Sequence, residues 1–166
     1  MNDPFNLNRF VTAQLEVYDQ ALREISDGDK RSHWMGFIFP HLPLPNMSDV
    51  SRYYAISGIE EAKAYLRHGV LGPRLIECTS LVNHHPGRCI SRIFHTADSL
   101  RFHASMTLFA RAAYRDSEFS LALDRYFDGQ REGSSHEILR SQIKQAEHQM
   151  QNRLSPAAQR LAATHL

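Results

Sequence analysis

The spacing of apolar residues along the chain predicts a succession of amphipathic helices. Near the N-terminus, Asn6 can cap a helix and Gly28 can end it, and apolar side chains recur between them at intervals of three and four residues. These apolar positions are Phe10, Ala13, Val17, Ala21 and Ile25. We therefore expect one helix that packs a single face on the core.

Segment 30–41 combines the only tryptophan of the chain with two phenylalanines, a methionine and several hydrogen-bond donors. Ser32 can cap a short helix here, and Pro40 must end it. Residues 37–39 alone would also suit a buried strand, because so short an apolar run has no assignable period. Helix is the preferred assignment and strand is the alternative.

Capping residues divide the middle of the chain. Ser57 and Glu60 have the spacing of a capping box, and Gly69 can close the helix that follows them. Pro73 lies in the first turn of the next predicted helix, which should end within residues 83–87.

The stretch from Leu100 to Ala113 is the longest apolar stretch, and we predict that it is the central helix. Thr96 or Asp98 opens it, and a short helix over residues 90–94 precedes it. Its apolar stripe consists of Phe102, Met106, Phe109 and Ala113.

Residues 1–133 are expected to form one globular domain. Its last element is a helix over residues 119–127, which Asp128 and Gly129 end. The whole pattern predicts an all-α or nearly all-α fold, with a single compact domain of about seven to eight helices.

Residues 134–166 are assigned to a helical C-terminal extension. Ser134 and Glu137 have the spacing of a capping box, residues 138–154 are mostly polar, and Ser155 can cap a last short helix. A helix that is polar nearly all round is rarely stable alone. We therefore expect the extension to pack on the domain or on a partner subunit.

The charge balance narrows the choice of partners. The chain has 19 basic and 18 acidic residues, and a net charge of +1 gives little attraction for nucleic acid. No apolar run approaches the ~20 residues of a spanning helix, and the N-terminus lacks the pattern of a signal peptide. We expect a soluble, cytoplasmic protein, in which ten histidines make binding sensitive to pH.

A metal or cofactor site is not expected. Five potential ligands, Cys78, His84, His85, Cys89 and His95, lie close together in the sequence, but their spacing matches no structural zinc pattern. Residues 69–74 lack the lysine and the spacing of a phosphate-binding loop. The two cysteines are interpreted as reduced thiols.

A series of short runs follows in order between residues 3 and 130. They are DPFNLNRF (3–10), KRSHWM (30–35), FIFP (37–40), YAI (54–56), AYLRH (64–68), LGPRL (71–75), IF (93–94) and SMTLF (105–109). Together they resemble the bacterial family catalogued as domain of unknown function 1810, whose members are sometimes labelled calpastatin without good reason. The resemblance implies a compact, mostly helical fold and no established reaction.

The chain also departs from the family pattern. Gly36 stands where the pattern has a second tryptophan, His41 where it has glutamine, Gly69 where it has proline and Ala104 where it has serine. The first two positions lie inside segment 30–41, so a site shared by the family would be altered here. A glycine in place of tryptophan vacates a large volume, which leaves either a wider pocket or a cavity refilled by neighbours.

His33 and Trp34 are the leading candidates for a ligand pocket. The indole can stack on a flat ligand such as a nucleobase or nicotinamide, while Lys30, Ser32 or His33 contacts its polar groups. Tyr54 is assigned to the same pocket, and His33 is the candidate acid–base residue. The alternative is that the aromatic residues are core, which is the commoner role of buried rings.

The central helix supplies the other candidates. His103 and Thr107 share a face one turn apart, and with Ser105 they are predicted to meet His33 across a cleft. The alternative is that the two hydroxyls bond back to helix carbonyls and that His103 lies at a rim.

Two functional hypotheses remain open from the sequence. In the first, the protein binds a small aromatic or nucleotide-like metabolite in a pocket lined by histidine and tryptophan, with hydrolysis as a further step. In the second, segment 30–41 is core, and the protein is a non-enzymatic module that acts through surface contacts or self-association of its C-terminal helices. Whether the protein is an enzyme is left undecided.

Overall fold

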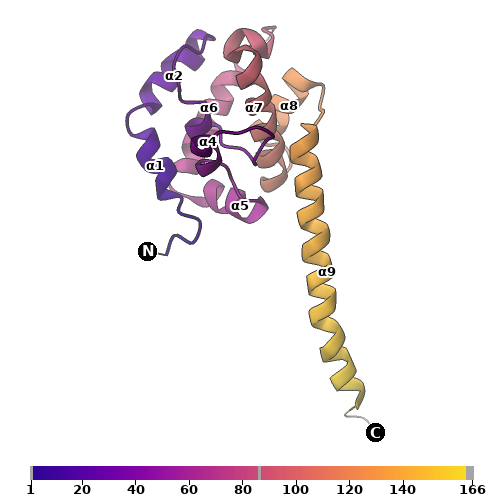
Figure 1. Cartoon of the computed structure of the whole chain (residues 1–166). Helices are drawn as coiled ribbons and strands as arrows, with labels where there is room; N and C mark the ends of the chain where they lie inside the picture. The colour runs from indigo at the N-terminus through magenta and orange to yellow at the C-terminus, as the bar shows by residue number, and fades with distance from the viewer. Residues whose placement is uncertain (1, 86, 164–166) are drawn as a thin grey trace.

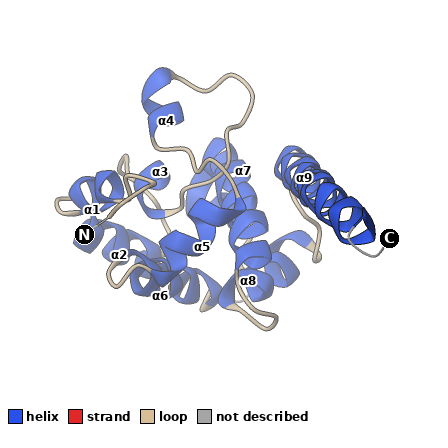
Figure 2. Ribbon diagram, turned by 90° about the horizontal axis from the view of Figure 1, so that it is seen from below, coloured by secondary structure: helices blue, strands red, loops and turns tan. Residues whose placement is uncertain are grey.

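The computed structural model describes residues 2–85 and 87–163, with side chains described as far as Asn152. Within these residues there are helices and loops and no strand, which confirms the predicted all-α fold (Figure 2). The helices are α1 (Asn8–Gln14), α2 (Tyr18–Asp27), α3 (Met35–Ile38), α4 (Asp49–Tyr53), α5 (Ile59–Arg67), α6 (Leu71–Asn83), α7 (Ile90–Ala112), α8 (Glu118–Phe127) and α9 (Gly133–Ala163).

The prediction of one helix between Asn6 and Gly28 is wrong, because the chain breaks between α1 and α2. The apolar period continues through the break, but Gln14 turns inward and donates from Nε2 to the carbonyl of Phe37 at 2.8 Å and to the hydroxyl of Tyr65 at 3.1 Å. This tertiary contact competes with helix continuation. Gly28 ends α2 in the left-handed conformation, as predicted.

Segment 30–41 forms a single helical turn, α3, so the helical assignment is confirmed and the strand alternative is wrong. The predicted cap is also wrong. Trp34 is the N-cap residue and makes no side-chain cap, whereas the Ser32 hydroxyl donates to Glu24 of α2. Pro40 follows the end of the turn, as expected.

The core is rich in aromatic rings packed around α7. Phe39 and Phe102 meet edge to face with centroids 5.0 Å apart, and Phe94 contacts Trp34 in the same way at 6.2 Å. All four rings are almost completely buried, and each contributes on the order of 2 kcal/mol or more through burial. Helix α7 packs against α3, α5, α8 and α9, which confirms its central position.

Helix α7 consists of two helical pieces, as the sequence predicts. They join at His95, which has φ 62° and ψ 175°. This backbone conformation is strained for a residue other than glycine, at a cost of roughly 1–3 kcal/mol. Surrounding contacts must therefore hold it in place.

Glycine and acidic side chains set the ends of α5 and α6. The predicted capping partner of Ser57 is Glu60, but the observed partner is Glu61. Its carboxylate accepts hydrogen bonds from both the amide and the hydroxyl of Ser57. His68 rather than Gly69 ends α5. At Gly72, a Cβ atom would lie 2.1 Å from the Leu66 carbonyl oxygen, so only glycine allows the two helices to approach so closely.

Helix α9 begins against the domain and then extends away from it (Figure 1). Its cap is Glu132, whose carboxylate accepts from the amides of Ser134 and Ser135, rather than the predicted pair Ser134 and Glu137. Leu139 is buried against the core, whereas Lys144 and the residues after it, as far as Asn152, are exposed. The predicted interruption at Ser155 is absent, because α9 is continuous as far as Ala163.

Candidate functional site

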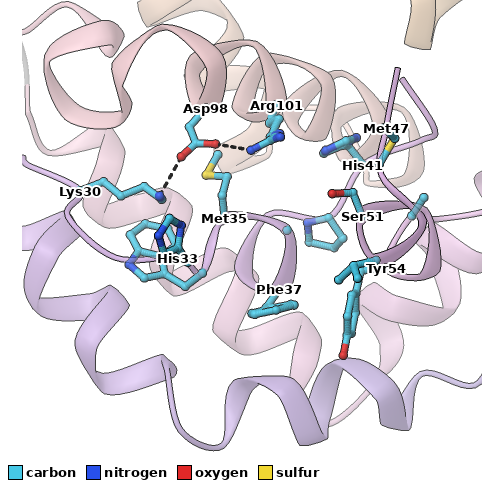
Figure 3. Close-up of a pocket in the computed structure, with 15 residues that line it drawn as sticks. Lys30, His33, Met35, Phe37, His41, Met47, Ser51, Tyr54, Asp98 and Arg101 are labelled. Atoms are coloured by element: carbon cyan, nitrogen blue, oxygen red, sulfur yellow. Dashed lines mark hydrogen bonds and ion pairs between the residues drawn. The ribbon is translucent and has the colours of Figure 1, made fainter. Parts of the chain in front are cut away.

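A cavity of about 170 Å³ lies between α3, α4 and the second piece of α7 (Figure 3). A cavity of ~150 Å³ can hold a benzene-sized molecule, so this one has room for a single flat ring. The residues labelled in the close-up are Lys30, His33, Met35, Phe37, His41, Met47, Ser51, Tyr54, Asp98 and Arg101.

Four of the residues assigned to the pocket from the sequence do line this cavity. They are Lys30, His33, Trp34 and Tyr54. His33 is exposed, whereas Trp34 is only 1% exposed and serves as core and as pocket wall at the same time. The fifth residue, Ser32, is directed away from the cavity towards Glu24.

The candidates on the central helix lie elsewhere. His103 stacks on Phe127 at 3.8 Å between ring centroids, and Thr107 donates to the His103 carbonyl oxygen at 2.9 Å. Ser105 is fully buried. None of the three lines the cavity, so the cleft predicted between them and His33 does not form. Thr107 shows the back-bonding that was the alternative interpretation.

Helix α7 instead contributes Asp98 and Arg101 to the cavity. The Asp98 carboxylate binds the Lys30 ammonium at 2.7 Å and the Arg101 guanidinium at 2.8 Å. The ammonium also lies 5.1 Å from the centre of the Trp34 ring, within cation–π range. Two cations share one carboxylate, so this edge of the cavity has a net positive charge and favours an anionic ligand.

His41 provides a neutral imidazole at the cavity. Burial lowers its pKa below the ordinary value, although the hydrogen bond with the Leu42 carbonyl opposes this shift. A carbonyl can only accept, so Nδ1, 2.7 Å from it, carries the proton. Nε2 is then left as an unprotonated acceptor, which is the form that a general base requires.

The opposite side of the cavity is apolar. Phe37 and Tyr54 meet edge to face at 4.7 Å, and Met35 and Met47 add further apolar surface to the lining. Gly36 also lines the cavity, and a Cβ atom built there meets nothing within 4 Å. Both departures from the family pattern inside segment 30–41, at Gly36 and His41, therefore lie on the cavity wall.

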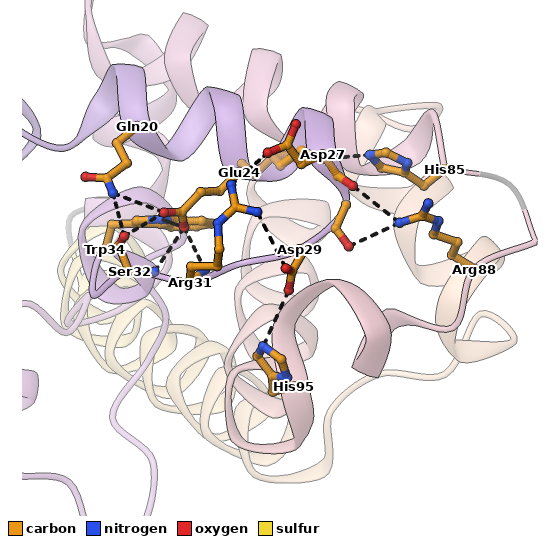
Figure 4. A network of polar contacts seen from close by, with 12 residues as sticks. Gln20, Glu24, Asp27, Asp29, Arg31, Ser32, Trp34, His85, Arg88 and His95 are labelled. Carbon is orange, nitrogen blue, oxygen red and sulfur yellow. Dashed lines mark hydrogen bonds and ion pairs between the residues drawn. The ribbon is translucent and has the colours of Figure 1, made fainter.

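Behind the cavity wall, Glu24 holds segment 30–41 from its buried side (Figure 4). Its carboxylate accepts from the Trp34 indole N–H at 2.8 Å, from the Arg31 amide at 2.8 Å and from both the amide and the hydroxyl of Ser32. Burial alone would raise the pKa of Glu24, but these hydrogen bonds lower it to about 2. Glu24 is therefore a charged structural anchor.

The kink in α7 holds the same segment from a second direction. The Lys30 amide donates to the Ile93 carbonyl at 2.8 Å, and Nε2 of His95 lies 3.1 Å from the Lys30 carbonyl oxygen. Both ends of one residue are thus fixed by the strained turn of the helix. This arrangement places the Lys30 side chain beside Asp98.

Sequence reasoning missed Asp98, Arg101 and His41 as site residues. Asp98 is a predicted helix opener, and an acidic residue with an arginine three positions later is also a recognisable helical pair. His41 directly follows Pro40 and departs from the family pattern. Its proximity to the aromatic run was the available signal.

The potential metal ligands remain dispersed. No group of three or more His, Cys, Asp or Glu side chains within the described part of the chain has metal-binding geometry. Cys78 and Cys89 are free thiols, and burial raises the pKa of Cys78 to about 12, so it is unsuited to nucleophilic chemistry. Among the described helices, none is long and apolar enough to cross a membrane.

Fold and cavity together define a small all-α protein with an aromatic pocket rimmed by charged residues. The chain belongs to the family described as protein of unknown function (DUF1810), whose model matches residues 4–139. It is similar to the conserved hypothetical protein Rv1873 from Mycobacterium tuberculosis, at 47% identity and a TM-score of 0.80. That comparison covers 82% of this chain and 98% of the other. No curated protein matches the chain.

Proposed function

We propose that the protein binds a small anionic metabolite with one flat ring, such as a nucleotide-like compound, in the cavity between α3, α4 and α7. The observation that carries the proposal is the pairing of an aromatic wall with two cations that share the single carboxylate of Asp98. Asp98 neutralises only one of the two positive charges, and an anionic ligand group would neutralise the other.

The lining of the cavity supports a ligand with two parts, a ring and a charged group. A ring fits the apolar side, next to Phe37 and Tyr54, and the charged group lies towards Lys30 and Arg101. His33, which is exposed beside the cavity, is positioned to contact the polar group.

A thermal-shift screen of nucleobases, nucleosides, nucleotides, NAD and ADP-ribose derivatives tests this proposal. A ligand at ~100 times its dissociation constant stabilises the folded state by roughly 2.7 kcal/mol, which raises the melting temperature by several degrees. The same shift should be reduced in His33→Ala and lost in Gly36→Trp, which fills the cavity from a position with free space.

The matched control is Gly133→Trp, because a Cβ atom at Gly133 also meets nothing within 4 Å and this residue lies outside the cavity. If no compound shifts the melting temperature, or if Gly36→Trp responds as the native protein does, the cavity is not a ligand site.

Hydrolysis of the bound ligand is a second candidate function. It is favoured by two imidazoles, His33 and His41, that line one cavity, the latter in its neutral form. A water molecule activated by one imidazole would attack the ligand, and the other would donate a proton to the leaving group. Product analysis by liquid chromatography tests this for every compound that binds, and unchanged turnover in the His33→Ala, His41→Gln double variant would contradict it.

Self-association through α9 is the non-enzymatic candidate. The observation that favours it is the length of α9 that extends beyond the domain (Figure 1). Deletion from Lys144 onward leaves Leu139 and Gln142 in contact with the domain and removes the rest of α9. An assembly device predicts fewer protomers per particle for the truncated chain, measured as the particle mass in light scattering divided by the protomer mass, and an unchanged number of protomers argues against it.

A further inference from the structure

A second cavity, of about 280 Å³, lies where α9 leaves the domain. It is enclosed by the C-terminal half of α7, by the loop before α9 and by the first three turns of α9. Arg111 comes from α7, Arg131 from the loop, and His136 and Arg140 from α9. None of these residues belongs to the cavity between α3, α4 and α7.

The second cavity has a strong positive charge. Its lining contains three arginines and one histidine, and no carboxylate is among the described residues that line it. At the cavity between α3, α4 and α7, by contrast, the exposed Arg101 has an acidic partner in Asp98. Three guanidinium groups around one small cavity repel one another unless an anion lies between them.

Glu132, the carboxylate that follows Arg131 in the sequence, caps α9. Its two oxygens accept hydrogen bonds from the amides of Ser134 at 3.0 Å and Ser135 at 2.7 Å, at the start of α9. These bonds lower the pKa of Glu132, although burial opposes the shift. The carboxylate therefore serves as a helix cap at the start of α9.

We propose that this second cavity binds the phosphate or pyrophosphate group of a small phosphorylated molecule. Guanidinium groups present parallel donors that match phosphate oxygens, and several of them together favour an anion with more than one charge. Leu139 and Ile143 form the apolar part of the lining, against which a short organic portion of the ligand packs.

The cavity depends on residues beyond the family match. Arg140 and Ile143 lie after residue 139, where the match ends. An anion held between Arg111 of α7 and Arg140 of α9 would connect the start of the projecting helix to the domain. Binding in the second cavity therefore stabilises the attachment of α9 as well as the ligand.

Titration calorimetry with pyrophosphate on the full chain tests the proposal. Arg131→Gln and Arg140→Gln should each weaken binding at least about tenfold, because each removes a charge-assisted hydrogen bond. Arg92→Gln is the matched control, since Arg92 is an exposed arginine on α7 that lines neither cavity. It should leave the dissociation constant unchanged, and circular dichroism should show the same helicity in all variants.

A fourth variant separates the two cationic cavities. Lys30→Gln removes a cation from the cavity between α3, α4 and α7 and leaves the second cavity intact. Pyrophosphate binding that is lost in Lys30→Gln and retained in Arg140→Gln overturns the proposal. So does a native dissociation constant above about 10 mM, or equal loss in Arg92→Gln, which would indicate only nonspecific attraction.

Discussion

Glu24 and Asp98 hold segment 30–41 from opposite sides, and they do so in different ways. Glu24 is 2% exposed and accepts hydrogen bonds from backbone and side-chain donors of Arg31, Ser32 and Trp34. The Asp98 side chain is 16% exposed and pairs only with two charged side chains at the cavity.

This difference separates a structural carboxylate from one that a ligand can influence. Glu24 has fixed donors, whereas the partners of Asp98 are long cationic side chains that a bound anion would also attract. Trp34 lies between the two, with its N–H directed to Glu24 and its ring face near Lys30. The Trp34 side chain therefore belongs to the core at its N–H edge and to the pocket wall at its ring face.

Neutralising Glu24 should have the largest effect on stability. In Glu24→Gln the amide group faces N–H and O–H donors, and the buried network loses its charge-assisted hydrogen bonds. We expect a loss of about 3 kcal/mol in the free energy of unfolding, measured by urea denaturation. Glu16→Gln, at an exposed position, should change it by less than about 0.5 kcal/mol.

Acid titration provides an independent check on Glu24. Its pKa is lowered from 4.5 to about 2 in the folded protein, so the carboxylate stabilises the fold above pH 4.5 and this contribution is lost as the pH falls towards 2. Native protein should therefore lose more stability than Glu24→Gln over this interval. Equal slopes for the two proteins would show that Glu24 is not a charged anchor.

Neutralising Asp98 should destabilise the fold less than neutralising Glu24 does, and it should strengthen the binding of an anionic ligand. Asp98→Asn leaves Lys30 and Arg101 without their shared anion, at a cost of about 1 kcal/mol. The cavity becomes more positive, so an anionic ligand found in the screen should bind several-fold more tightly. Calorimetry at two salt concentrations measures this gain, with Asp19→Asn as an exposed control. Weaker binding would show that Asp98 itself contacts the ligand.

The smallest effect is expected at His41. Its pKa is lowered in the folded protein, so the unfolded chain binds more protons and the stability should decrease as the pH falls below 6.5. His41→Gln should remove this part of the pH dependence. The measurement is the difference in melting temperature between the native protein and the variant at about pH 7.5 and pH 5.5. A constant difference would indicate that His41 does not titrate in this range.

Local sequence patterns were sufficient for most of the fold. Gly28 and Asp128 mark helix ends because their left-handed conformations are local properties, and the two pieces of α7 follow from Thr96 or Asp98, either of which can open a second helix. The break before α2 could not be predicted, because Gln14 is drawn inward by Phe37 and Tyr65, which are distant in sequence. Tertiary contacts of this kind override an uninterrupted period.

The candidate site was only partly predictable for the same reason. Segment 30–41 attracted attention because its aromatic and polar residues are adjacent, and His33 and Trp34 do line the cavity. The sequence of α7 does not indicate which face of this helix lines the cavity. His103 and Asp98 are both plausible polar candidates, and only the orientation imposed by the kink at His95 decides which of them faces the cavity.

The contact between Lys30 and His95 also closes a long loop of the chain. It joins residues 65 positions apart, so the intervening chain must be ordered before the loop can close at low entropic cost. Helices α5 and α6 lie inside that loop. Because Trp34 is the only tryptophan and is bonded to Glu24 at the same place, its fluorescence reports the moment at which the loop closes.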